Sequence, residues 1–178
     1  MKHPLTPLVA FLLVVNGAPA VQARTRAKRE DDIRAVVVWH MMPTKEEVEK
    51  RPVAKRSGFD PPPIQVFYLS YWSRGAFRDP SDQFLQRFRG GVIPLKKASD
   101  SYVDRNAKDY GWSFIKDRKT QQLGARLDVG RIRWLSSTRV DVRAGYVAGG
   151  VNASHSLYSL RFSRGHGKVV KLTDTMVS

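Results

Sequence analysis

The sequence has no cysteine among its 178 residues. No disulfide can form, no thiol can act as a nucleophile, and zinc sites built on cysteine thiolates are excluded. Lipid attachment through cysteine is excluded for the same reason. Many small exported domains are stabilised by disulfides. This chain cannot form any, so its fold must be stabilised by side-chain packing. Hydrophobic residues make up 42% of the chain, which is enough for a core.

Apolar runs long enough to cross a bilayer are also missing near the N-terminus. The run Leu8–Val15 is eight residues long, whereas a membrane-spanning helix needs about 20. It follows a positively charged start and precedes small residues up to Ala23, a pattern typical of a cleavable secretory signal. We therefore predict a signal peptide over 1–23, cleaved after Ala23 or Ala20. The mature protein is expected to be periplasmic or secreted, with no transmembrane segment.

Acidic residues are scarce, with 16 Asp and Glu against 31 Lys and Arg, for a formal net charge of +15. Such a field attracts polyanions: nucleic acid, anionic lipid or acidic polysaccharide. A surface charge that only keeps the protein soluble is the alternative. The stretch 24–29 has no apolar anchor, so we predict a disordered tail there. Its cations Arg24, Arg26, Lys28 and Arg29 are candidates for non-specific polyanion contact, and deleting it is expected to leave stability unchanged. No sequence-specific nucleic acid recognition is expected.

Catalytic and metal-binding motifs are few. His155 and His166, with Lys168, suggest acid–base cleavage of RNA. They lie at opposite ends of one predicted strand, on the order of 30 Å apart, so they cannot serve one substrate. Gly165–Lys168 lacks the spacing of a phosphate loop and indicates a hairpin turn. The histidines stand apart from one another and from carboxylates, so we predict no metal site and no cofactor.

The first half of the chain predicts helices followed by a strand. Acidic residues open a helix from Glu30 to Met41, which Pro43 ends. A capping box at Thr44–Glu47 starts a short second helix. Ile64–Trp72 is rich in β-branched and aromatic residues and reads as a buried strand. A proline near its start and a glycine pair at its end frame a third helix over 79–89. The segment 92–110 is expected to be irregular, with a single strand inside it as the alternative.

The last third alternates between apolar and polar residues, which predicts strands. Four strands joined by short turns are expected at Leu127–Leu135, Val140–Tyr146, His155–Ser163 and Val169–Met176. The alternation places Trp134 inward and Arg133 outward. We predict a single α+β domain over 30–178, with N-terminal helices packed on a curved antiparallel β-sheet that ends in a C-terminal four-stranded meander.

Large aromatic residues are spread over this domain. A cavity between helices and sheet would be lined by five of them, Tyr68, Trp72, Trp112, Trp134 and Tyr146. Ordinary core packing is the alternative, because large aromatic side chains dominate protein cores.

The order of elements resembles the cystatin-like and nuclear-transport-factor-2-like folds. The sequence also resembles a group of uncharacterised exported bacterial proteins. The residues that carry this second resemblance are Val66–Ser70, Asp79–Asp82, Phe84, Leu85, Arg87, Phe88, Ile132–Trp134, Val140–Val142, Gly145, Tyr146, Ala153, Ser154 and Tyr158. The resemblance implies export and a compact domain, but no activity.

We therefore predict a non-enzymatic binding or accessory protein of the bacterial cell envelope. The alternative is a small hydrolase or isomerase with its site in the cavity. A pair of ionisable groups on inward-facing positions would distinguish the two, and the sequence pattern alone reveals no such pair.

Overall fold

The structure is a computed structural model that describes residues 18–50, 63–105, 113–149, 152–163 and 166–177. The helices are α1 (Ala18–Met41), α2 (Lys45–Glu49) and α3 (Asp82–Gln86), with a 3-10 turn η1 at Ala98–Asp100. The strands are β1 (Val66–Ser73), β2 (Ala76–Arg78), β3 (Leu95–Lys97), β4 (Ser101–Asp104), β5 (Phe114–Asp117), β6 (Leu123–Trp134), β7 (Arg139–Gly149), β8 (Asn152–Ser163) and β9 (His166–Val177). The predicted apolar segment Leu8–Val15 and the candidate Trp112 lie outside the described residues.

All nine strands belong to one mixed sheet with the main order β2-β1-β6-β7-β8-β9. Consecutive strands from β6 to β9 pair antiparallel. The expectation of a wholly antiparallel sheet is wrong at β1, which pairs parallel with β3 and β6. Parallel neighbours need a long connection, and the chain between β1 and β6 supplies one. It contains β2 to β5. Over 92–110 the sequence suggested an irregular segment with at most one strand, and the described part of that range holds β3, η1 and β4.

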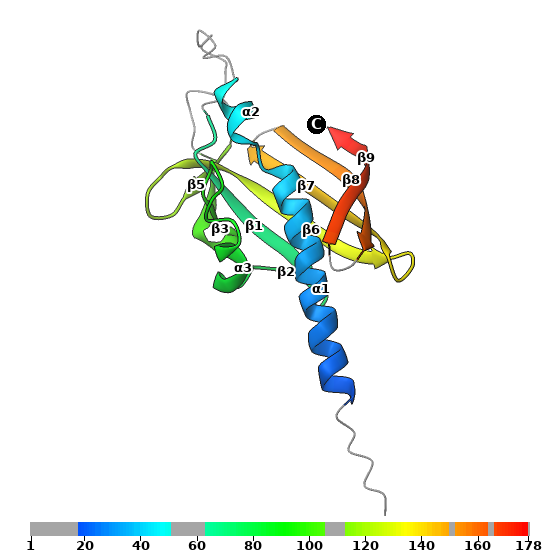
Figure 1. Cartoon of the computed structure of the whole chain (residues 1–178). Helices are drawn as coiled ribbons and strands as arrows, with labels where there is room; N and C mark the ends of the chain where they lie inside the picture. Colours follow the sequence, from blue (N-terminus) through cyan, green and yellow to red (C-terminus); the bar gives the residue numbers. More distant parts are fainter. Residues whose placement is uncertain (1–17, 51–62, 106–112, 150–151, 164–165, 178) are drawn as a thin grey trace, which may run out of the picture.

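Helix α1 lies across one face of the curved sheet (Figure 1). Its residues Ile33, Val37 and Val38 are fully buried in one core cluster with Leu127 of β6 and Val142 of β7. The run Val36–Val38 favours strand by propensity, yet it is helical here because burial against the sheet outweighs a weak local preference. The protein is thus α+β, but the cover is mostly one helix. Among the described residues, α2 buries no side chain and α3 buries only Phe84.

The strands alternate much as their sequence indicates, with one interruption. Leu127 and Val129 of β6 face α1. A bulge between Val129 and Ile132 then shifts the register by one residue. Beyond it, the side chain of Arg133 is 72% exposed, as expected. Trp134 packs against the core but is half-buried, less deeply placed than the alternation predicts.

Residues 24–29 are helical, so the prediction of a disordered tail is wrong. Arg26 pairs with Glu30 one turn along, at 3.3 Å. The guanidinium of Arg29 lies 4.5 Å from the centre of the Trp134 ring and donates to the carbonyl of Ser137. These partners lie far along the chain or on the next helical turn, so composition alone does not reveal them. Both predicted cleavage points lie within α1, and cleavage stays a prediction.

Replacing Arg29 by alanine is expected to lower the free energy of unfolding by about 1 kcal/mol, because the cation–π contact and the packing of the aliphatic stem are lost. Lys28→Ala is the matched control, since Lys28 is exposed on the same turn and should change stability by less than about 0.5 kcal/mol. Urea titration of both variants measures the difference. Equal values would show that the basic turn of α1 does not dock on the sheet.

Candidate anion-binding site

The face of β6 to β9 turned away from α1 carries an excess of cations. Residues directly opposite in paired strands share a face, so the registers show which side chains lie together. Its exposed basic residues, which we call the cationic face, are Arg131, Arg133, Arg139, Arg143, Arg161, Lys168 and Lys171. The half-buried Arg126 and the carboxylates of Asp128 and Asp141 lie on the same face, so its formal charge is 8 − 2 = +6.

Three of these cations form a row across neighbouring strands. Arg139 of β7 lies opposite Arg161 of β8, which lies opposite Lys168 of β9. Like charges directly opposite each other destabilise a sheet. None of the three forms an ion pair with a described residue. A bound anion would relieve the repulsion.

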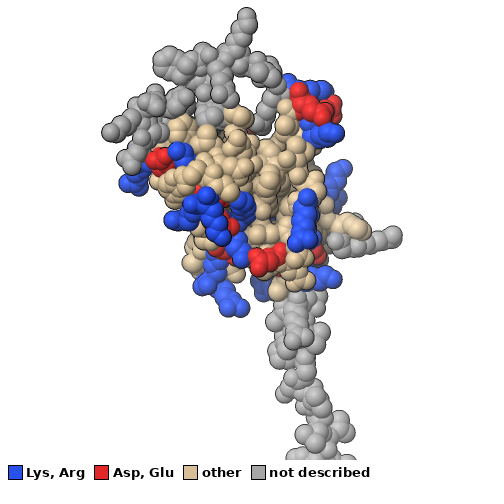
Figure 2. All heavy atoms as spheres, turned by 90° about the vertical axis from the view of Figure 1, so that its left-hand side faces the viewer, with Lys and Arg blue, Asp and Glu red and all other residues tan. Residues whose placement is uncertain are grey.

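Elsewhere on the molecule, cations and acids are mixed. Figure 2 shows the side of α3 and β3, where basic side chains (blue) stand among acidic ones (red). Arg87 pairs there with Asp32 at 2.9 Å, and Lys97 pairs with Asp82 at 2.8 Å. On the cationic face only Arg133 has a carboxylate partner among the described residues, Asp141 at 3.0 Å. Six of the seven cations on this face therefore have no ion pair with a described residue.

A cavity of about 1070 Å³ opens on this face where β1 and β2 meet β6. Its aromatic wall is Trp72 and Phe77, whose rings meet edge to face with centres 5.3 Å apart. Arg131 and Arg143 contribute guanidinium groups, and Arg26 reaches it from α1. Cations, aromatic rings and carboxylates in one concave site fit a small ligand with both anionic and ring-shaped parts.

Two ionisable residues lie in one row of this cavity. Asp128 is opposite Gly145, which is opposite His155, and both ionisable side chains line the cavity. A Cβ on Gly145 would collide with the His155 imidazole and with the carbonyl oxygen of Ser154. The glycine therefore leaves the space that the His155 ring occupies. The hydroxyl of Ser70 donates to Asp128 from the neighbouring strand β1.

Sequence reasoning missed this row because its members come from three separate strands, with Ser70 added from a fourth. The signal that could have revealed it is a glycine at an outward position of an alternating strand, next to a histidine in the following strand.

The predicted cavity residues are only partly brought together. Trp72 and Trp134 line the cavity. Tyr146 packs against the core on the α1 face, and Tyr68 is buried in a small cluster with Val66 and Ile115. Of the predicted polyanion contacts, Arg26 lines the cavity, Arg29 covers Trp134 and Lys28 is exposed. Arg24 lies in α1, but its side chain is outside those described.

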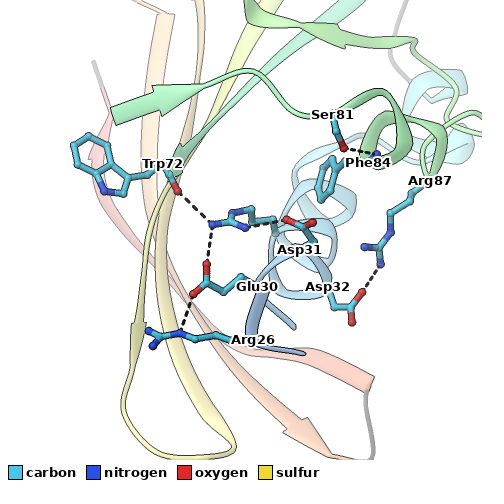
Figure 3. Close-up of polar contacts among 9 residues, drawn as sticks. Arg26, Glu30, Asp31, Asp32, Trp72, Ser81, Phe84 and Arg87 are labelled. Carbon is cyan, nitrogen blue, oxygen red and sulfur yellow. Dashed lines mark hydrogen bonds and ion pairs between the residues drawn. The ribbon is translucent and has the colours of Figure 1, made fainter. Parts of the chain in front are cut away.

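A buried arginine anchors α1 to the aromatic wall (Figure 3). Arg34 is 6% exposed, and its guanidinium binds Asp31 at 2.9 Å, Glu30 at 3.1 Å and the carbonyl oxygen of Trp72 at 3.3 Å. It also lies 4.5 Å from the centre of the Tyr71 ring. A buried cation must be paired to be tolerated, and these contacts fix α1 against the end of β1 that carries Trp72.

A second polar cluster lies at the turn between β5 and β6. Asp117 is 2% exposed and accepts from Lys96 Nζ at 2.7 Å and from the backbone N–H groups of Lys119 and Thr120 at 2.8 Å. The hydrogen bond from Lys96 and the backbone donors hold the pKa of Asp117 well below its ordinary value. Burial, with the nearby Asp117, raises the pKa of Tyr68. Asp117 ties the turn together through these contacts, so we assign it a structural role.

Comparisons with known proteins return nothing: no family model, no curated protein and no solved structure matches the chain. The resemblance to uncharacterised exported proteins therefore stays a prediction. Within the described part of the chain, no cluster of three or more histidine, aspartate or glutamate side chains could hold a metal ion. No described helix combines the length and the apolar character needed to cross a membrane.

Proposed function

We propose that this protein is an exported, non-enzymatic binding domain of the bacterial cell envelope, and that its cationic face binds anionic ligands. The basic composition supports attraction of polyanions. The arrangement of the charge supports a defined surface, because seven exposed cations share one face with two carboxylates.

The row Arg139–Arg161–Lys168 carries this proposal. Charges that only keep a protein soluble can be spread over the whole surface and can be of either sign. Directly opposed cations cost stability in the free protein. The cost is offset when an anion bridges them through charge-assisted hydrogen bonds, for which arginine is well suited.

The test is the triple variant Arg139→Gln, Arg161→Gln, Lys168→Gln, assayed for binding to heparin and to a short DNA duplex over a range of salt concentrations. Each lost phosphate contact should flatten the slope of log affinity against log salt for the duplex by about 0.9. We expect a loss of two to three such contacts and a matching drop in heparin affinity.

The matched control is Lys28→Gln, Arg89→Gln, Lys119→Gln, which removes the same formal charge from exposed positions outside the cationic face. It should keep most of the affinity. If both triple variants lose affinity equally, binding follows net charge alone and the proposed surface is wrong.

A small hydrolase is the second candidate, and the row of Asp128 and His155 in the cavity favours it. A carboxylate and an imidazole on one side of a bound substrate could exchange protons with it. Product formation from a bound oligosaccharide by the wild type, lost in His155→Ala while binding persists, would replace the binding-domain proposal with this one.

A further inference from the structure

We infer that the cavity at the end of the cationic face is a subsite for an acidic sugar, so that the ligand of this face is an acidic oligosaccharide. This inference rests on the proposed function, and it adds the chemical class of the ligand. Three kinds of group in the cavity favour such a ligand: the aromatic wall, the unpaired guanidinium groups and the hydrogen-bond acceptors.

The aromatic wall is held in place by its hairpin. Arg74 and Gly75 join β1 to β2 with φ values of 51° and 81°, the left-handed pair of a tight two-residue turn. This turn sets Trp72 directly opposite Phe77 on the cavity side. Phe77 is 51% exposed, so apolar ring surface faces solvent in the cavity. Such a surface suits the C–H face of a pyranose ring, because aromatic faces carry partial negative charge.

The guanidinium groups come from β6 and β7. The bulge between Val129 and Ile132 contains Gly130 and Arg131, and a Cβ on Gly130 would lie 2.6 Å from the carbonyl oxygen of Arg143. Glycine thus permits the close approach at the bulge that sets Arg131 and Arg143 around one cavity. Neither arginine has an ion-pair partner among the described side chains. Both guanidinium groups are free to form bidentate hydrogen bonds with a carboxylate or a sulfate.

The hydrogen-bond acceptors in the cavity disfavour a nucleic acid as the ligand. Asp128 accepts from Ser70 and forms no ion pair with any residue that the structure describes, and its carboxylate lines the cavity. A DNA duplex carries one charge per about 1.7 Å of axis, which would set phosphates against this carboxylate. A sugar acid separates its charges by hydroxyl groups, which donate to carboxylates. The mixture of arginines with Asp128 and His155 therefore favours an acidic saccharide over a polyphosphate chain.

The experiment measures the affinity of the purified protein for two probes of similar charge, a short heparin oligosaccharide and a single-stranded thymidine oligonucleotide. We expect the wild type to bind the oligosaccharide at least tenfold more tightly. Phe77→Ala and Arg143→Gln should each lower oligosaccharide affinity about tenfold and change oligonucleotide affinity by less than threefold. Val103→Ala and Arg89→Gln are the matched controls, because both are exposed away from the cavity.

A fluorescence readout keeps the test independent of folding effects. Oligosaccharide binding should change the tryptophan emission, and Trp72→Phe should reduce that change to the part that comes from Trp134, which also lines the cavity. The variant retains an aromatic ring and should keep most of the affinity. Melting curves show that each variant is folded.

The outcomes separate the two proposals. If the triple variant of the arginine–lysine row weakens both probes and the cavity variants weaken neither, the cationic face stands and the sugar subsite is wrong. If the oligonucleotide binds more tightly and this depends on Phe77, the ligand class is wrong. If neither set of variants matters, both proposals fail.

Discussion

Replacing Asp117 by alanine is expected to lower the free energy of unfolding by about 3 kcal/mol, because hydrogen bonds to a charged group are each worth roughly 1.5–3 kcal/mol and are not additive. The substitution removes the acceptor for Lys96 Nζ and for the backbone N–H groups of Lys119 and Thr120. It also leaves the buried hydroxyl of Tyr68 without its partner. Urea titration at neutral pH measures the loss.

Asp117→Asn is the control that separates the contribution of the backbone hydrogen bonds in the turn from that of the negative charge. One amide oxygen can still accept from both backbone N–H groups, which now bind a single carboxylate oxygen. The ion pair with Lys96 is lost, and the Tyr68 hydroxyl, which donates to the same carboxylate oxygen, must instead accept from the new amide N–H. The expected cost is about 1 kcal/mol. Equal and small costs for both variants would show that the β5–β6 turn does not depend on this carboxylate.

The effect of Asp117 should vary with pH in a defined direction. Its pKa is lowered in the folded state, so its contribution is complete above the ordinary carboxyl value of about 3.9 and is lost as the pH falls below that value toward the folded pKa. The difference in stability between the wild type and Asp117→Ala should stay constant between about pH 5 and 8 and narrow below about pH 4. A difference that grows on acidification would contradict the assignment.

Gly145→Ala is expected to cost about 2 kcal/mol, within the range of overpacking substitutions. The new methyl group would lie 2.9 Å from His155 Cε1 and would also collide with the carbonyl oxygen of Ser154. The imidazole can rotate away, but the Ser154 carbonyl belongs to the backbone of β8, so β7 and β8 must separate. The variant should also bind the heparin oligosaccharide more weakly, because His155 leaves its place in the cavity.

Gly90→Ala is the matched control, since an added Cβ there meets nothing within 4 Å and the backbone has no positive φ. Its stability should change by less than about 1 kcal/mol, and the change can be favourable because alanine restricts the unfolded chain. If Gly145→Ala and Gly90→Ala change the free energy of unfolding equally, β7 and β8 do not approach closely at the cavity.

Several features of this protein follow from the sequence by itself. The alternation from Leu127 onward determines which face of β6 to β9 meets the core, since successive side chains in a strand point to opposite sides. The capping box at Thr44 is present as predicted and starts α2. Local signals of this kind act within a few residues, so the sequence alone determines β1, the four C-terminal strands, the capped helix and the α+β class.

Only the tertiary structure decided how those elements combine. The parallel pairing of β1 with β6 depends on a connection of many residues, which no local pattern specifies. The composition of residues 24–29 predicts disorder, yet Arg29 packs on the ring of Trp134, more than 100 residues away in the sequence. The row Arg139–Arg161–Lys168 and the row Asp128–Gly145–His155 arise only when strand registers align. Register depends on packing and turns, so the candidate site exists only in the folded sheet.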